Sequence, residues 1–124
     1  VDFMAADSVT AMPQMSGGRV RVLAVADARR STLLPNVPAV AETLKGFSCG
    51  SWNGLFVPAG TPKPIVDRLA RETLDILAPP EVVARLAGIG FEVAPLGPAP
   101  FAAYLREQSE LWGRRIRDAG IQPQ

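Results

Sequence analysis

The side chains that could act as nucleophiles stand without the partners that nucleophilic catalysis needs. Cys49 is the only cysteine, and the chain contains no histidine to activate it. It lies in an apolar, strand-like stretch, so we expect a buried and inert thiol. Four candidate serine nucleophiles have no base nearby in sequence and do not lie in a Gly-x-Ser-x-Gly turn: Ser8, Ser31, Ser48 and Ser51. The sequence therefore predicts no catalytic residues.

The carboxylates are spaced as on solvent-facing helices. Glu107, Glu110 and Asp118 share a predicted helix with several arginines, which favours surface ion pairs over an acid/base pair. Asp67 and Asp75 flank Arg71 at intervals of four and are interpreted in the same way. Neither a metal-ligand spacing nor a phosphate-binding glycine loop is present in the sequence. We therefore expect no enzyme activity, no bound metal and no cofactor.

Length and charge further limit the classes of protein to which this chain could belong. The chain has 124 residues, of which 48% are hydrophobic, enough for the core of one ordinary domain. Its 13 basic residues nearly balance its 12 acidic ones. A surface without a strong basic field argues against nucleic acid as the main partner. No apolar run approaches the roughly 18 residues that a membrane span requires.

The order of apolar and helix-forming segments predicts an α/β fold with largely parallel strands. Strands are expected at residues 1–4, 20–26, 49–57 and 91–94. Helices are expected from Asp7 or Ser8 to about residue 15, and over about 39–44, 64–77, 81–87 and 100–119. The last helix carries an apolar stripe made of Phe101, Leu105, Gln108, Trp112 and Ile116.

Asp7 and Ser8 are the first candidates for a ligand site. They follow a predicted strand and open a predicted helix, where ligands of α/β proteins meet exposed backbone amides. A plain helix N-cap is the alternative explanation for the same two residues.

The stretch 51–62 is the second unusual feature. It begins as a strand with Trp52 and Phe56 on one side, so both rings are expected to pack inward. It then breaks at Pro58, Gly60 and Pro62 before the next helix. Several prolines and a glycine in one strand-to-helix connection favour a crossover between two domains over a segment of one continuous core.

An ordered set of segments resembles the tripartite tricarboxylate transporter solute receptors, also called Bug receptors. The segments are VDFM at 1–4, GRVRVLAV at 18–25, Arg30 with LPNVP at 34–38, GSWNGLF at 50–56, PAGTP at 58–62, WG at 112–113 and DAGI at 118–121. Each segment alone is weakly specific. Their order over nearly the whole chain makes the resemblance specific.

The resemblance implies a type II periplasmic-binding-protein fold with two lobes. Such a receptor captures a small organic anion, usually a carboxylate, outside the cytoplasm and passes it to membrane permease subunits. Family members are about twice this length, so we expect a C-terminal fragment that begins inside a strand. Residues 1–50 would belong to the second, ligand-cleft lobe, 51–62 to the inter-lobe crossover, and 63–124 to the C-terminal part of the first lobe.

The same resemblance implies which residues line the cleft. The loop after the first strand, Ala5, Ala6, Asp7 and Ser8, would face the ligand, although relatives often carry an aromatic residue, an Asp and an Asn there. Ala26 and Asp27, at the end of the next strand, would edge the cleft. The hinge would comprise Ser51, Trp52, Asn53 and Gly54. The negative charge of Asp7 would disfavour a ligand carboxylate placed beside it.

Two other hypotheses compete with the receptor fragment. A free-standing small α/β module that dimerises for an interaction or regulatory role would also explain the length, whereas an enzyme is the weakest reading. In the fragment, sheet edges and helix faces without partners should be exposed. We therefore expect self-association as a symmetric homodimer, and weak or absent binding of organic acids.

Overall fold

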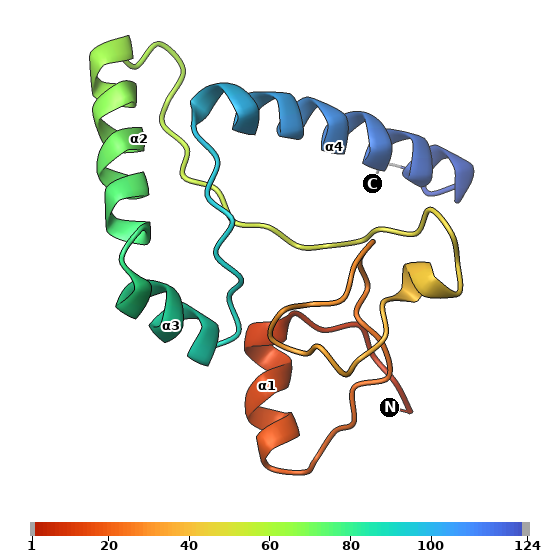
Figure 1. Cartoon of the computed structure of the whole chain (residues 1–124). Helices are drawn as coiled ribbons and strands as arrows, with labels where there is room; N and C mark the ends of the chain where they lie inside the picture. The colour runs from red at the N-terminus through yellow and green to blue at the C-terminus, as the bar shows by residue number, and fades with distance from the viewer. Residues whose placement is uncertain (1, 123–124) are drawn as a thin grey trace. The chain divides into compact units, whose positions relative to one another are not determined.

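The computed structural model describes residues 2–122 and shows four α-helices and one short 3-10 helix in this part of the chain. The elements are α1 (Ser8–Ser16), η1 (Val40–Glu42), α2 (Lys63–Leu77), α3 (Pro80–Gly88) and α4 (Pro98–Asp118) (Figure 1). They fall into two compact units. Unit 1 comprises Val1–Val57 with Leu77–Val93, and unit 2 comprises Pro58–Ile76 with Ala94–Gln124.

In unit 1, α1 begins where its capping residue predicts. Asp7 has extended backbone angles, and its Oδ1 accepts a hydrogen bond from the Thr10 backbone N–H at 2.8 Å. This bond satisfies one of the N–H groups that a helix start leaves without a partner. Pro13 lies inside the helix without ending it, and Gly17 is its C-cap. The predicted helix is confirmed with nearly the expected bounds.

The remaining α-helices also begin close to the predicted residues. α3 has Pro79 as N-cap and Pro80 in its first turn, where the missing proline N–H costs no helical hydrogen bond. In unit 2, α4 begins with Pro98 after Gly97, and α2 begins at Lys63. The half-buried side of α4 carries Phe101, Tyr104, Leu105, Gln108, Leu111 and Arg115, whereas Trp112 and Ile116 of the predicted stripe are exposed.

The predicted strands are absent as paired strands within residues 2–122. Residues 20–26, 49–57 and 91–94 form no ladder there, and only Val25 is assigned to a β-bridge. One isolated parallel bridge joins Val25 to Ala39, through Val25 N to Pro38 O at 2.8 Å and Val40 N to Val25 O at 2.9 Å. A strand is defined by its hydrogen-bonded neighbour. The sequence thus predicts extended backbone here, while the described residues supply almost no neighbours.

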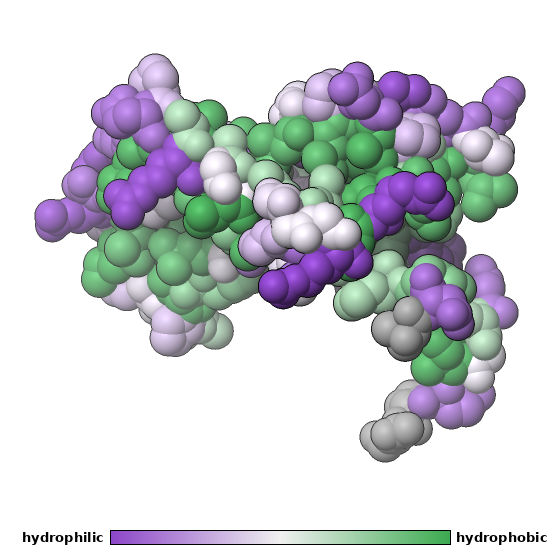
Figure 2. Space-filling view, turned by 90° about the horizontal axis from the view of Figure 1, so that it is seen from below, coloured by the Kyte–Doolittle hydropathy of each residue, from purple (hydrophilic) through white to green (hydrophobic). Residues whose placement is uncertain are grey.

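Burial is correspondingly slight. Ala39, at the bridge, and Gly90 are the two buried residues in the described part of the chain. Large apolar side chains are exposed in both units, including Phe3, Leu55 and Phe56 in unit 1 and Ile65 and Ile76 in unit 2. Figure 2 shows wide hydrophobic areas on the face that it presents. The described residues of each unit are therefore held by helix caps, turns and polar contacts more than by a buried hydrophobic core.

Candidate functional site

The first predicted ligand segment lies at the start of α1 in unit 1. Ala5 and Ala6 are exposed and have no regular secondary structure, Asp7 is the N-cap, and Ser8 is the first helical residue. Hydrogen bonds from Thr10 hold the pKa of Asp7 below its usual 3.8, so the carboxylate is charged at neutral pH. Asp7 thus has the capping role that was the alternative explanation of this pair. The negative charge of Asp7 lies at the start of α1, where it would repel an anion that approaches the helix N-terminus.

The second predicted segment, Ala26–Asp27, is tied to the chain just before the predicted hinge. The Ala26 carbonyl accepts a hydrogen bond from the Cys49 N–H at 2.9 Å. Asp27 Oδ1 accepts from Ser48 Oγ at 3.0 Å and from the Ala28 N–H at 2.6 Å. A Cβ added to Gly50 would lie 3.0 Å from Asp27 Oδ2, so the glycine leaves room for this carboxylate. Asp27 therefore links residues 48–50 to the strand end.

The predicted hinge, Ser51–Gly54, has no regular secondary structure and is exposed. Trp52 and Phe56 do share a side, with ring centroids 6.4 Å apart and planes inclined at 51°. The expectation that both rings pack inward is wrong, since Trp52 is 39% and Phe56 62% exposed. The expectation of a buried Cys49 is also wrong, because its thiol is exposed. Both errors concern a stretch, residues 49–57, that forms no paired strand within the described residues 2–122.

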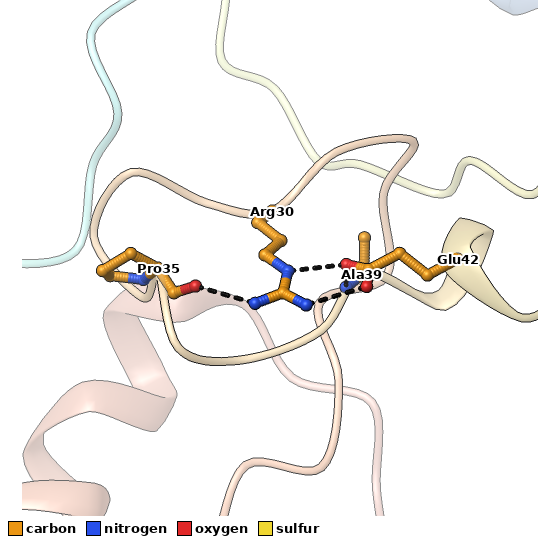
Figure 3. A network of polar contacts seen from close by, with 4 residues as sticks. All are labelled: Arg30, Pro35, Ala39 and Glu42. Atoms are coloured by element: carbon orange, nitrogen blue, oxygen red, sulfur yellow. Dashed lines mark hydrogen bonds and ion pairs between the residues drawn. The ribbon is translucent and has the colours of Figure 1, made fainter.

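The loop between the two halves of the parallel bridge is closed by an arginine network (Figure 3). Arg30 Nε and Nη2 donate to the two carboxylate oxygens of Glu42 at 2.7 and 2.8 Å, and Nη1 donates to the Pro35 carbonyl at 3.2 Å. Glu42 Oε1 also accepts from the Ala39 N–H at 2.8 Å. Arg30, followed by the Ala39 N–H, lowers the pKa of Glu42 from 4.5 to about 2. The network holds Ala39 at the bridge to Val25.

Sequence reasoning did not single out Glu92, although it makes the densest contact with the loop after Asp27. Its carboxylate accepts from Ser31 Oγ at 2.8 Å, from the Thr32 N–H at 2.9 Å and from Thr32 Oγ1. Partial burial raises the pKa of Glu92, but the bonds from Thr32 and Ser31 and the charge of Arg29 outweigh it and hold the pKa below 4.5. A lone acid in an apolar predicted strand was the available signal.

The described residues contain no cluster of three or more histidine, cysteine or acidic side chains that could hold a metal ion. A shallow depression in unit 2 is lined by Asp67, Ala70, Arg71, Leu74, Asp75 and Pro98. None of these belongs to the predicted ligand segments, which lie in unit 1. Of the helices in residues 2–122, none combines the length and the apolar character needed to cross a bilayer.

The family comparison agrees with the ordered segments of the sequence. The model of the tripartite tricarboxylate transporter family receptor matches residues 1–121. The chain belongs to this receptor family. Solved structures likewise show the periplasmic-binding-protein fold class. R. palustris Rpa4515 with adipate superposes with a TM-score of 0.84 at 28% identity, covering 94% of this chain and 40% of that one.

Other relatives are also similar to this receptor chain over most of its length. The periplasmic binding protein BugD superposes with a TM-score of 0.79 at 33% identity, over 92% of this chain and 39% of BugD. A protein from the tcbD-tcbE intergenic region of Pseudomonas sp. (strain P51) is 39% identical over 119 residues, which is 94% of this chain and 35% of that protein. BugT of Bordetella pertussis is 26% identical over 110 residues, 88% of this chain and 34% of BugT. The chain thus spans about a third of the length of these two curated relatives, so the expectation of relatives about twice its length is too low for them.

Proposed function

We propose that this chain is part of an extracytoplasmic receptor that captures a small organic anion, a carboxylate, for a tripartite tricarboxylate-type transporter. The observation that carries the proposal is the family match over residues 1–121. The similarity to a receptor solved with adipate supports a carboxylate as the ligand class. In this proposal the receptor works outside the cytoplasm, catalyses no reaction and delivers its ligand to the permease subunits.

The ligand would meet unit 1 at Ala5–Ser8 and at Ala26–Asp27. Both carboxylates there already have hydrogen-bond donors: Asp7 caps α1 and Asp27 binds Ser48. They would therefore orient the backbone rather than bind an anion directly. Main-chain N–H groups near Ala5 and Ala6 are the groups available to a ligand carboxylate. The absence of side chains beyond Cβ at these two alanines leaves space for an acyl chain.

The lobe assignment is part of the same proposal. Residues 1–50 would contribute to the ligand-cleft lobe, 51–62 would cross between lobes, and 63–124 would complete the first lobe. Ser51–Gly54 would then act as the hinge, which their exposure and lack of regular secondary structure permit. In a complete receptor, neighbouring strands would cover Trp52 and Phe56, which are exposed here.

Chemical-shift titration of the 124-residue chain with adipate tests the ligand proposal. Because one wall of the cleft would be missing, we expect weak binding, with a Kd of about 1 mM or more, equivalent to roughly 4 kcal/mol. Adipate should shift the amides of residues 5–8 and 26–28. Neutral adipamide is the control and should leave them unchanged. Equal shifts with adipamide, or adipate shifts confined to other residues, would contradict the proposal.

We also propose that the isolated chain forms a homodimer through its exposed apolar surface. Leu55 and Phe56 are more than 60% exposed, which is costly for large apolar side chains in water. A second copy would cover this stretch by symmetric contact. Sedimentation equilibrium over a wide concentration range should show a monomer–dimer exchange. Replacing Leu55 and Phe56 by serine should shift it to monomer, and a wild-type monomer at high concentration would refute the idea.

A further inference from the structure

The short segment after α3 touches the start of α1. Gly90 is buried and has φ +97°, a conformation that side-chain-bearing residues rarely adopt. A Cβ at this position would lie 2.9 Å from the carbonyl carbon and oxygen of Ser8 and from the Val9 nitrogen. The Gly90 backbone therefore lies directly against the first peptide of the helix that follows the loop 5–8.

Two residues later, the same segment holds the turn that follows the predicted ligand segment Ala26–Asp27. Glu92 accepts hydrogen bonds from Ser31 Oγ at 2.8 Å, from the Thr32 N–H at 2.9 Å and from Thr32 Oγ1. Ser31 Oγ in turn accepts from the Leu33 N–H at 3.1 Å. The carboxylate thus orders the turn that begins four residues after Asp27.

Both contacts are made by the same short segment, residues 90–92. Residues 90–92 span at most about 7 Å of backbone, since extended chain advances roughly 3.3 Å per residue. A displacement of this segment would move the start of α1 and the loop 31–33 together. Both structures belong to unit 1, so the connection lies within one compact body.

We propose that Gly90 and Glu92 form a shared brace that positions both ligand-lining segments of the receptor. Gly90 sets the approach of α1, and Glu92 sets the turn after Asp27. Neither residue need touch the ligand, so both are positioning residues. The ligand-related part of this inference rests on the proposed function, whereas the mechanical part concerns the chain alone.

Glu92→Gln tests the brace, because the amide keeps one acceptor oxygen and loses the other. We expect amide hydrogen exchange at Thr32 to become about tenfold faster. Exchange at Thr10 and Ala11, in the first turns of α1, should also become faster if the brace is shared. Glu107→Gln on α4, in unit 2, is the charge-matched control and should change neither region.

The adipate titration separates positioning from mere stability. Glu92→Gln should weaken adipate binding about fivefold, which is a coupling of ordinary size. Gly46→Ala, in unit 1, is the stability control, because Gly46 has φ +80° and no atoms within 4 Å of an added Cβ. It should cost stability yet leave adipate affinity within about twofold.

Each outcome decides one claim. Unchanged exchange at Thr32, or faster exchange there with α1 unaffected, overturns the shared brace. Equal losses of affinity in Glu92→Gln and Gly46→Ala overturn the positioning role. If the wild-type chain shows no adipate shifts, the isolated chain does not hold this ligand, as the missing wall of the cleft allows, and exchange at Thr32, Thr10 and Ala11 alone decides the brace.

Discussion

Gly90→Ala should be the most damaging of the conservative substitutions in unit 1, for two separable reasons. At φ +97° a Cβ strains the backbone by about 1–2 kcal/mol. The same Cβ would lie 2.9 Å from three backbone atoms of Ser8 and Val9, and relieving such overlap costs roughly 1–3 kcal/mol. The loss of unfolded-state entropy returns about 0.4–1 kcal/mol. The net expectation is a loss of about 2–4 kcal/mol.

Two other glycines of unit 1 supply matched controls. Gly46 has φ +80° with open space around it, so Gly46→Ala carries the strain alone and should cost about 1 kcal/mol. Gly88 ends α3 with no atoms within 4 Å of an added Cβ and no positive φ. Gly88→Ala should therefore stabilise the chain by up to about 1 kcal/mol.

Urea denaturation followed by far-ultraviolet circular dichroism measures the three effects. With a denaturant slope of about 1–2 kcal/mol/M, Gly90→Ala should lower the midpoint by about 2 M relative to Gly88→Ala. From the highest urea midpoint to the lowest, the order should be Gly88→Ala, wild type, Gly46→Ala and Gly90→Ala. A midpoint for Gly90→Ala equal to that of Gly46→Ala would show that Gly90 does not contact the start of α1.

Three further predictions follow from the polar contacts and the exposed thiol. Because the folded pKa of Glu42 is about 2 and its ordinary value is 4.5, its stabilising contribution is complete above pH 4.5 and is lost as the pH falls toward 2; urea midpoints should decline over this range in the wild type and less in Glu42→Gln. Asp7→Ala should speed amide exchange at Thr10, whereas Asp7→Asn, which retains a capping oxygen, should change it less; equal effects would contradict the cap. Native Cys49 should react fully with a thiol reagent as fast as the unfolded chain does, and a protected thiol would disprove its exposure.

The local elements of this chain could be predicted because their signals lie within a few residues. Asp7 before a helix-compatible run, Pro80 in a first turn and Gly17 after a last turn each act through neighbouring backbone groups. These signals predicted the α-helices to within a few residues. The ordered segments also predicted the receptor family, since family resemblance depends on sequence alone.

Pairing and burial could not be predicted in the same way, because both depend on groups distant along the chain. The stretch 49–57 has the composition of a buried strand, yet Cys49, Trp52 and Phe56 are exposed. The chain spans about a third of its curated relatives. An apolar pattern indicates that a strand needs neighbouring strands or helices to cover it. It does not indicate whether the chain contains those neighbours.

The sequence by itself predicted the four α-helices to within a few residues and the receptor family, and it contains no nucleophile–base pair, whereas the helix expected over about 39–44 is a 3-10 helix at Val40–Glu42. Each of these depends on residue identity or on contacts within one helical turn. Only the tertiary structure showed that Gly90 lies against Ser8 and that Glu92 binds Ser31 and Thr32 across about 60 positions of the chain. Contacts at such separation follow from the path of the folded backbone, which no local spacing encodes.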